Sequence, residues 1–146
     1  GDGRYKSDLE RAINKLNLQK YFIFLGSYPS IEMPHFFSLA DALYVSLNSS
    51  DIFSLTIPNK VQSYMACGKP IIASLNGEGS RIINESKSGI TSPAENIDEL
   101  VNSIIKFKNL SSLQRKKMGQ NARSYFLKEF ERNSLIEKII NYLNEK

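Results

Sequence analysis

Apolar positions along the chain follow two patterns, one typical of helices and one typical of short buried strands. Four segments show helical spacing or helical composition: residues 4–16, 97–105, 112–130 and 134–144. Four short apolar runs predict strands: residues 21–25, 42–47, 70–74 and 89–91. We also expect a short helix over 34–39 and a polar loop over 48–56.

The segment 57–79 carries the most informative pattern. Pro58 and Gly68 bound a predicted helix, because proline suits the first helical turn and glycine commonly follows the last. The next run, 70–74, is apolar without polar alternation, as in a strand covered on both faces. Glycines at 77 and 79 predict a turn, followed by a helix from about Ser80. Open α/β sheets use this arrangement to bind nucleotides at the carboxyl ends of their strands.

Strands and helices alternate along most of the chain, which predicts a parallel sheet with helices on both faces. The expected fold class is therefore α/β, with a Rossmann-like sheet. At 146 residues the chain is long enough for one domain with a real core, and 41% hydrophobic and 23% charged residues are globular values. Neither a secretory signal nor a membrane-spanning stretch is evident in the sequence.

The charge and the rare residues narrow the classes of function. The net charge is +4, but the basic run 115–117 is not interleaved with aromatic residues, which argues against nucleic-acid binding. A weak attraction to anionic membranes or phosphorylated substrates fits better, and a solvated helix start with a basic face fits better than either. The single cysteine, Cys67, excludes an internal disulfide and fits a cytoplasmic protein. With one histidine, His35, and no Asp-x-Asp pair, we expect neither a metal site nor a cofactor.

A set of short motifs, in order, resembles one enzyme family over nearly the whole chain. Its members are Gly1-Asp-Gly-Arg4, Phe24-Leu-Gly26, Met33-Pro34, Ala40-Asp-Ala42, the stretch from Pro58 to Pro70, Gly77-Glu-Gly79, Gly89 and Met118-Gly119. Together they resemble the donor-binding half of GT-B glycosyltransferases of the retaining family 4 type, which build bacterial surface polysaccharides. The resemblance implies hexosyl transfer from a nucleotide-diphosphate sugar, expected to be UDP-linked, to a glycan or lipid-linked acceptor, in the cytoplasm or at the inner face of the membrane.

The same resemblance implies that residues 1–146 are part of a nucleotide-sugar domain, with the acceptor-binding N-terminal domain absent. Gly1-Asp-Gly3 resembles the turn after the second strand of this half, so two strands and a helix would be missing. In the family those strands lie between the ones expected at 21–25 and 42–47. Open sheet edges would then favour a dimer or strand exchange, and the fragment alone is expected to be inactive.

Candidate donor-site residues follow from the chemistry of a nucleotide-diphosphate sugar. Helix starts at Pro58 and Ser80 offer free N–H groups and a favourable dipole to the diphosphate. The resemblance places the base over the loop after Gly26. The candidates are Ser27 and Tyr28 for the base, Pro58, Asn59 and Lys60 for phosphate, Ser63 for ribose, Gly77 and Gly79 for phosphate, and Glu78 for a sugar hydroxyl. Plainer roles remain open: a solvated Lys60 and Glu78, a surface Tyr28, and glycines that serve only a tight turn.

The catalytic residues are not identified. Many relatives carry two glutamates eight positions apart, and the matching positions here are Leu55 and Ser63. A leucine cannot act as a carboxylate. Two alternatives therefore stay open, a non-catalytic nucleotide-binding α/β module and a GT-B type sugar-nucleotide epimerase. A phosphate-loop NTPase does not fit, because Gly68-Lys69 is followed by Pro70.

Overall fold

The structure is a computed structural model that describes residue 3 and residues 5–144. These residues form two compact units, which divide between His35 and Phe36. The expected opening motif falls largely on Gly1, Asp2 and Arg4, which lie outside the described residues.

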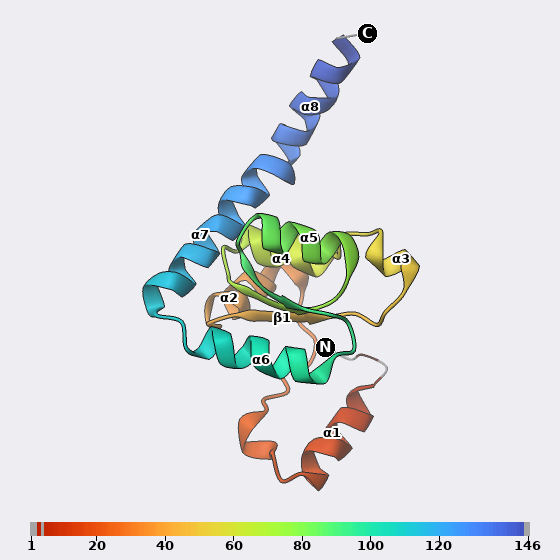
Figure 1. Cartoon of the computed structure of the whole chain (residues 1–146), viewed down its shortest axis with the longest axis vertical. Helices are drawn as coiled ribbons and strands as arrows, with labels where there is room; N and C mark the ends of the chain where they lie inside the picture. Colours follow the sequence, from red (N-terminus) through yellow and green to blue (C-terminus); the bar gives the residue numbers. More distant parts are fainter. Residues whose placement is uncertain (1–2, 4, 145–146) are drawn as a thin grey trace. The chain divides into compact units, whose positions relative to one another are not determined.

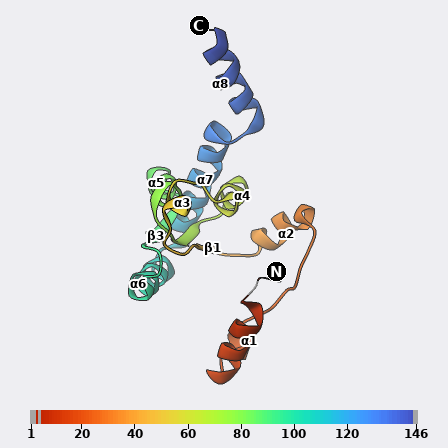
Figure 2. The same cartoon turned by 90° about the vertical axis from the view of Figure 1, so that its right-hand side faces the viewer.

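The first unit contains α1 (Lys6–Lys15), the 3-10 turns η1 (Gln19–Tyr21) and η2 (Ser30–Glu32), and the start of α2 (Met33–Ser38). The strand expected at 21–25 is wrong: Tyr21 ends η1, and residues 22–29 follow as an irregular connection (Figure 2). The side chains of Ile23 and Leu25 are exposed. A strand needs a neighbour that completes its hydrogen bonds, and the only sheet of the described residues lies in the second unit.

The second unit is built on a three-stranded parallel sheet. Its strands are β1 (Leu43–Ser46), β2 (Ile71–Ser74) and β3 (Gly89–Ser92), in the order β1-β2-β3. Ala73 of β2 pairs with Val45 on one side and Thr91 on the other. The three predicted strands at 42–47, 70–74 and 89–91 are thus confirmed. All four residues of β2 are buried, as its unbroken apolar sequence predicts.

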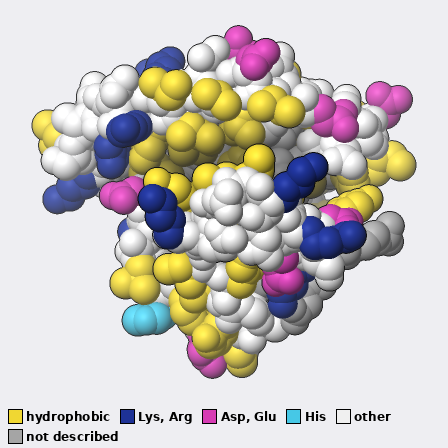
Figure 3. Space-filling view, turned by 90° about the horizontal axis from the view of Figure 1, so that it is seen from below, with side chains coloured by type: hydrophobic (Ala, Val, Ile, Leu, Met, Phe, Trp, Pro, Cys, Tyr) yellow, Lys and Arg dark blue, Asp and Glu magenta, His cyan; other side chains and the backbone are white. Residues whose placement is uncertain are grey.

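Helices cover both faces of this sheet (Figure 1). The helices α4 (Asn59–Ala66) and α5 (Gly77–Glu85) lie on one face, and α6 (Ile97–Lys108) lies on the other. Right-handed crossovers from β1 to β2 and from β2 to β3 place α4 and α5 on the same face. Exposed apolar side chains on the outer side of α6 form part of the hydrophobic surface in the upper half of Figure 3. The predicted α/β fold with a parallel sheet is confirmed.

The helix α7 (Ser112–Glu129) packs against α4 through two glycines. Gly68 ends α4 with a φ of +64°, and a Cβ on Gly119 would lie 2.3 Å from the carbonyl oxygen of Gly68. Only a residue without a side chain permits this approach at Gly119. A capping box at Ser111 starts α7, and α8 (Arg132–Asn144) continues beyond it (Figure 1).

Two local expectations need correction. The loop 48–56 contains a short helix, α3 (Asp51–Ser54), and α5 begins at Gly77 rather than near Ser80. The sequence alone predicts a turn at these glycines, because glycine is common in tight turns. Here Gly77 has a φ of +70° and forms the first residue of the helix, where a Cβ would lie 2.0 Å from the carbonyl oxygen of Ser54. Its lack of a side chain therefore serves the contact between α3 and α5.

Candidate functional site at the carboxyl edge of the sheet

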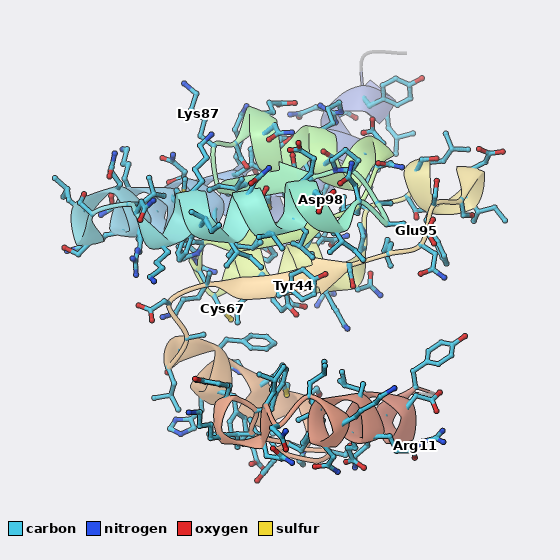
Figure 4. All side chains as sticks on the ribbon, turned by 60° about the horizontal axis from the view of Figure 1, so that its bottom comes forward. Arg11, Tyr44, Cys67, Lys87, Glu95 and Asp98 are labelled. Carbon is cyan, nitrogen blue, oxygen red and sulfur yellow. The ribbon has the colours of Figure 1, made fainter. Side chains whose placement is uncertain are left out.

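The chain enters two helices, α4 and α5, from the carboxyl edge of the sheet. The three strands are parallel, so β1, β2 and β3 all end at this edge. Figure 4 shows Cys67 and Lys87 near the end where the strands begin, and Glu95 near the end where they finish. The first turns of α4 and α5 follow β1 and β2 at that second end. The predicted helix openings therefore share one edge.

The openings of α4 and α5 are also direct neighbours. A Cβ on Gly79, in the first turn of α5, would lie 3.1 Å from Cδ of Pro58, the residue before α4, and 2.9 Å from Cδ1 of Leu75. Gly79 is buried, and the lack of a side chain there lets the two helix starts approach each other. Their backbone N–H groups are thus brought into one neighbourhood.

Among the residues that the structure describes, no side chain caps either opening. Pro58 precedes α4 and offers no capping group, while the Asn76 side chain turns away from α5 and accepts a hydrogen bond from the Ala94 amide at 3.0 Å. By contrast, Asn96 caps α6 and Ser111 caps α7. The first-turn amides of a helix have no intrahelical acceptor, and the helix dipole adds partial positive charge. The pair of openings therefore offers donors to an anion.

The side chains at the start of α4 are exposed to this region. Lys60 has no ion pair or hydrogen bond with any residue that the structure describes, so its ammonium is available to a ligand. Ser63 lies one turn further along, and its hydroxyl donates to the carbonyl oxygen of Asn59 at 3.0 Å. With that proton engaged, the Ser63 oxygen can accept a hydrogen bond from a ligand hydroxyl.

The glycines predicted to contact phosphate both have a packing role. Gly77 lies against the backbone of Ser54, and Gly79 lies against Pro58 and Leu75. Neither glycine needs a ligand to account for its presence. Their amides still lie in the uncapped first turn of α5, so the two roles are compatible.

Glu78 lies in the first turn of α5, where its solvent-exposed carboxylate pairs with Arg81 one turn along the helix. Both carboxylate oxygens accept from Arg81 Nε at 3.0 Å, and Arg81 also pairs with Glu85. The hydrogen bond to Arg81 lowers the pKa of Glu78 below its usual value. The carboxylate is therefore ionised at neutral pH and presents acceptors only. The spacing of three and four residues on a helix would have predicted this triad.

Ser27 and Tyr28, predicted to contact the base, belong to the first unit. Both side chains are exposed in the irregular connection between η1 and η2. The remaining seven candidates all lie in the second unit, at or next to the two helix openings: Pro58, Asn59, Lys60, Ser63, Gly77, Glu78 and Gly79. The role of Ser27 and Tyr28 stays a prediction.

A hollow that the sequence does not predict lies at the same edge, on the side covered by α6. Its volume is about 210 Å³, and its lining includes Tyr44, Ser46, Ser74, Glu95 and Asn96. Glu95 has a φ of +61°, an uncommon backbone conformation for glutamate, and its carboxylate accepts from the Ser49 amide at 3.2 Å. Glu95 thereby links the loop after β3 to the loop after β1 (Figure 4). Its place is set by contacts distant in sequence.

Comparison with known protein families shows which kind of domain this chain contains. The family model described as glycosyl transferases group 1 matches residues 1–125. The chain belongs to this family. A search of curated proteins with this sequence found no match.

Solved structures agree with this glycosyltransferase fold. Sucrose-phosphate synthase from Thermosynechococcus elongatus superposes on 99% of the chain with a TM-score of 0.80 and 19% identity. HepE from Anabaena, solved in complex with UDP, superposes on 97% with a TM-score of 0.76 and 19% identity. The chain covers 35% and 37% of those two proteins, about a third of their length. The group 1 glycosyltransferase domain is therefore of the Rossmann-like GT-B type.

Two positions of this glycosyltransferase domain differ from the glutamates expected of many relatives. Leu55 directly follows α3 and is 80% exposed, and Ser63 is exposed on α4. Among residues 3 and 5–144, no three His, Cys, Asp or Glu side chains are grouped so as to hold a metal ion. None of the helices in the same residues is long and apolar enough to cross a membrane.

Proposed function

We propose that this chain is the donor-binding domain of a retaining hexosyltransferase, which holds a UDP-linked sugar at the carboxyl edge of the sheet. The observation that carries the proposal is the pair of adjoining, uncapped openings of α4 and α5, together with the ammonium of Lys60 on the first turn of α4, which has no partner among the described residues. Membership of the group 1 family and the fold shared with the UDP complex of HepE support it.

In this proposal the diphosphate accepts hydrogen bonds from the first-turn amides of both helices. Asn59, Lys60, Gly77 and Gly79 supply those amides, and Lys60 adds a formal positive charge. When the bond from the sugar to the diphosphate breaks, negative charge grows on the leaving phosphate. Donors already fixed in position stabilise that charge more in the transition state than in the ground state.

The remaining candidates contact the nucleoside and the sugar. Ser63 accepts a hydrogen bond from a ribose hydroxyl, since its own proton is directed to Asn59. Glu78, held ionised by Arg81, accepts one from a sugar hydroxyl. Ser27 and Tyr28 form the floor for the base. No metal or cofactor takes part, because helix amides and Lys60 supply the positive charge that a divalent cation would otherwise provide.

The proposal extends to the whole protein. Residues 1–146 are part of the donor domain, and a separate acceptor-binding domain supplies the glycan or lipid-linked acceptor in polysaccharide biosynthesis at the inner face of the membrane. This chain alone then binds donor weakly and transfers nothing. Its outer strands β1 and β3 each pair on one side only within the described sheet, which would allow a dimer of the fragment.

Isothermal titration of the chain with UDP tests the donor site. We expect weak binding that Lys60→Gln reduces about fivefold, because a partly screened charge contact is worth about 1 kcal/mol. Lys106→Gln, on an exposed position of α6, is the matched control and should leave the affinity unchanged. Equal affinities for UDP in both variants and the unaltered chain would remove Lys60 from the site, and absence of UDP binding would refute the proposal.

A further inference from the structure

A second hollow lies at the opposite edge of the sheet, where the strands begin. It has a volume of about 420 Å³ and lies between α7 and the segments that lead into β1 and β2. Its lining residues are Ala40, Asp41, Gly68, Lys69, Pro70, Arg115, Lys116, Gly119, Gln120 and Arg123. This amino-edge hollow is separated from the proposed donor site by the length of the strands.

The lining of the amino-edge hollow is strongly basic. Four of its side chains are cationic, namely Lys69, Arg115, Lys116 and Arg123, and one, Asp41, is acidic. Asp41 is 86% exposed and its oxygen lies 3.7 Å from Arg115 Nη1, so it offsets little of the positive charge. Four cations facing one hollow repel one another, and an anion placed among them would relieve that repulsion.

Two of these cations are held in place by backbone carbonyls. The ammonium of Lys69 donates to the carbonyl oxygens of Ser38 at 2.6 Å and Ala40 at 3.0 Å, and Arg123 Nη1 donates to that of Ala66 at 2.7 Å. Side chains fixed in this way lose little further conformational freedom when a ligand binds. The hollow is therefore preorganised for a charged ligand.

Arg115 supplies the observation that points to a ligand. Its guanidinium lies 5.0 Å from the centre of the Phe107 ring, and Nη2 donates to the carbonyl oxygen of Lys108 at 2.8 Å. Its Nε is buried and finds no hydrogen-bond partner among the described residues. Burying a charged donor without an acceptor is costly, and native structures generally avoid it. Because Nε has almost no accessible surface, an anion in the hollow would offset the charge of this guanidinium through its more accessible nitrogens rather than by bonding to Nε.

We propose that the amino-edge hollow binds a phosphate group. A phosphate carries close to two negative charges at neutral pH and several acceptor oxygens, which matches a site with four cations better than a single carboxylate does. The side chain of Lys116 is exposed and has no partner in the part of the chain that the structure describes. Its ammonium is therefore available to bind the phosphate. The site is independent of the donor site, since it shares no residue with it.

Nuclear magnetic resonance of the 15N-labelled chain tests the proposal directly. Inorganic phosphate is titrated against chloride at constant ionic strength while the Nε–H signal of Arg115 is followed. We expect a saturable shift of that signal, with an affinity that Lys116→Gln lowers about fivefold, as for a partly exposed charge contact. Lys117→Gln removes the neighbouring charge, which does not line the hollow, and should leave the affinity within about twofold.

Two results would overturn the proposal: an Arg115 signal that phosphate does not move, or equal loss of affinity in the Lys116 and Lys117 variants, which indicates bulk screening. The source of the phosphate is resolved by a parallel sedimentation of the chain with vesicles of phosphatidylglycerol and of phosphatidylcholine. Binding to phosphatidylglycerol alone that depends on Lys116 supports a lipid headgroup. Phosphate binding without vesicle binding supports a soluble phosphorylated ligand.

Discussion

Replacement of Gly77 by alanine tests the packing that holds the opening of α5 in place. Gly77 has a φ of +70°, and a Cβ there would lie 2.0 Å from the carbonyl oxygen and 2.4 Å from Cα of Ser54. These are backbone atoms, which cannot rotate away as a flexible side chain could. The substitution therefore adds a steric clash between α3 and α5 to the strain of a left-handed backbone.

Gly68→Ala is the matched control, because it imposes the strain without the clash. Gly68 has a similar φ of +64°, but a Cβ there would have its nearest neighbours at 3.5 Å, an ordinary contact distance. The left-handed conformation costs an alanine about 1–2 kcal/mol, and the lower entropy of the unfolded chain returns about 0.4–1 kcal/mol. We expect Gly68→Ala to lower the free energy of unfolding by about 1 kcal/mol.

For Gly77→Ala the clash adds about 1–3 kcal/mol, typical of overpacking, so we expect a total loss of about 2–4 kcal/mol. Urea unfolding followed by circular dichroism measures both variants, with the stability change read from the midpoint at constant slope. If the two variants lose the same stability, Ser54 does not lie against Gly77 and the described opening of α5 is wrong.

Two further predictions concern ionisable groups. Burial raises the pKa of Tyr64, so the contribution of its protonated hydroxyl to stability is complete below pH 10 and is lost as the pH rises through the folded pKa. Tyr64→Phe should therefore flatten the alkaline loss of stability. The same variant deletes the 3.2 Å hydrogen bond to the Tyr44 carbonyl oxygen and should cost about 1 kcal/mol of stability at neutral pH. An unchanged alkaline profile would contradict the first part. The hydrogen bond to Arg81 lowers the pKa of Glu78, so Arg81→Gln should raise that pKa towards 4.5 in a carboxyl 13C titration, and an unchanged value would rule out the pair.

Local sequence patterns were sufficient to predict the helices and strands around the sheet. Pro58 and Gly68 mark the limits of α4 because each has a backbone property that no other residue shares, a fixed φ in one case and easy access to positive φ in the other. The unbroken apolar run of β2 likewise reflects burial on both faces. These features act within a few residues, so the sequence alone predicts them.

Strand pairing and close contacts between distant segments were not predictable from local sequence. The run 21–25 has the apolar content of a strand but ends in an irregular connection, since a strand also needs a partner. The early start of α5 depends on Ser54, twenty-three residues before Gly77, and the placement of Glu95 depends on Ser49. Contacts between distant segments decide these features, and a local pattern does not encode them.

The candidate site was likewise predictable only in part, because some of its features are local in sequence and others depend on distant contacts. Both helix openings were expected at one edge because each follows a strand of a parallel sheet, and the structure brings Pro58 and Gly79 into contact there. The pairing of Arg81 with Glu78 and with Glu85 was missed, although its helical spacing was visible. The absence of a cap on α4 follows from Pro58, which has no capping group, but that on α5 could not be foreseen, because Asn76 is a good capping residue whose side chain instead bonds to Ala94.

The most direct test of the donor site is a titration of the 15N-labelled chain with UDP, with every backbone amide followed. We predict that the largest saturable shifts fall on the amides of Asn59, Lys60, Gly77 and Gly79, at the uncapped openings of α4 and α5. Saturable shifts confined to other segments, with these four amides unmoved, would contradict the account.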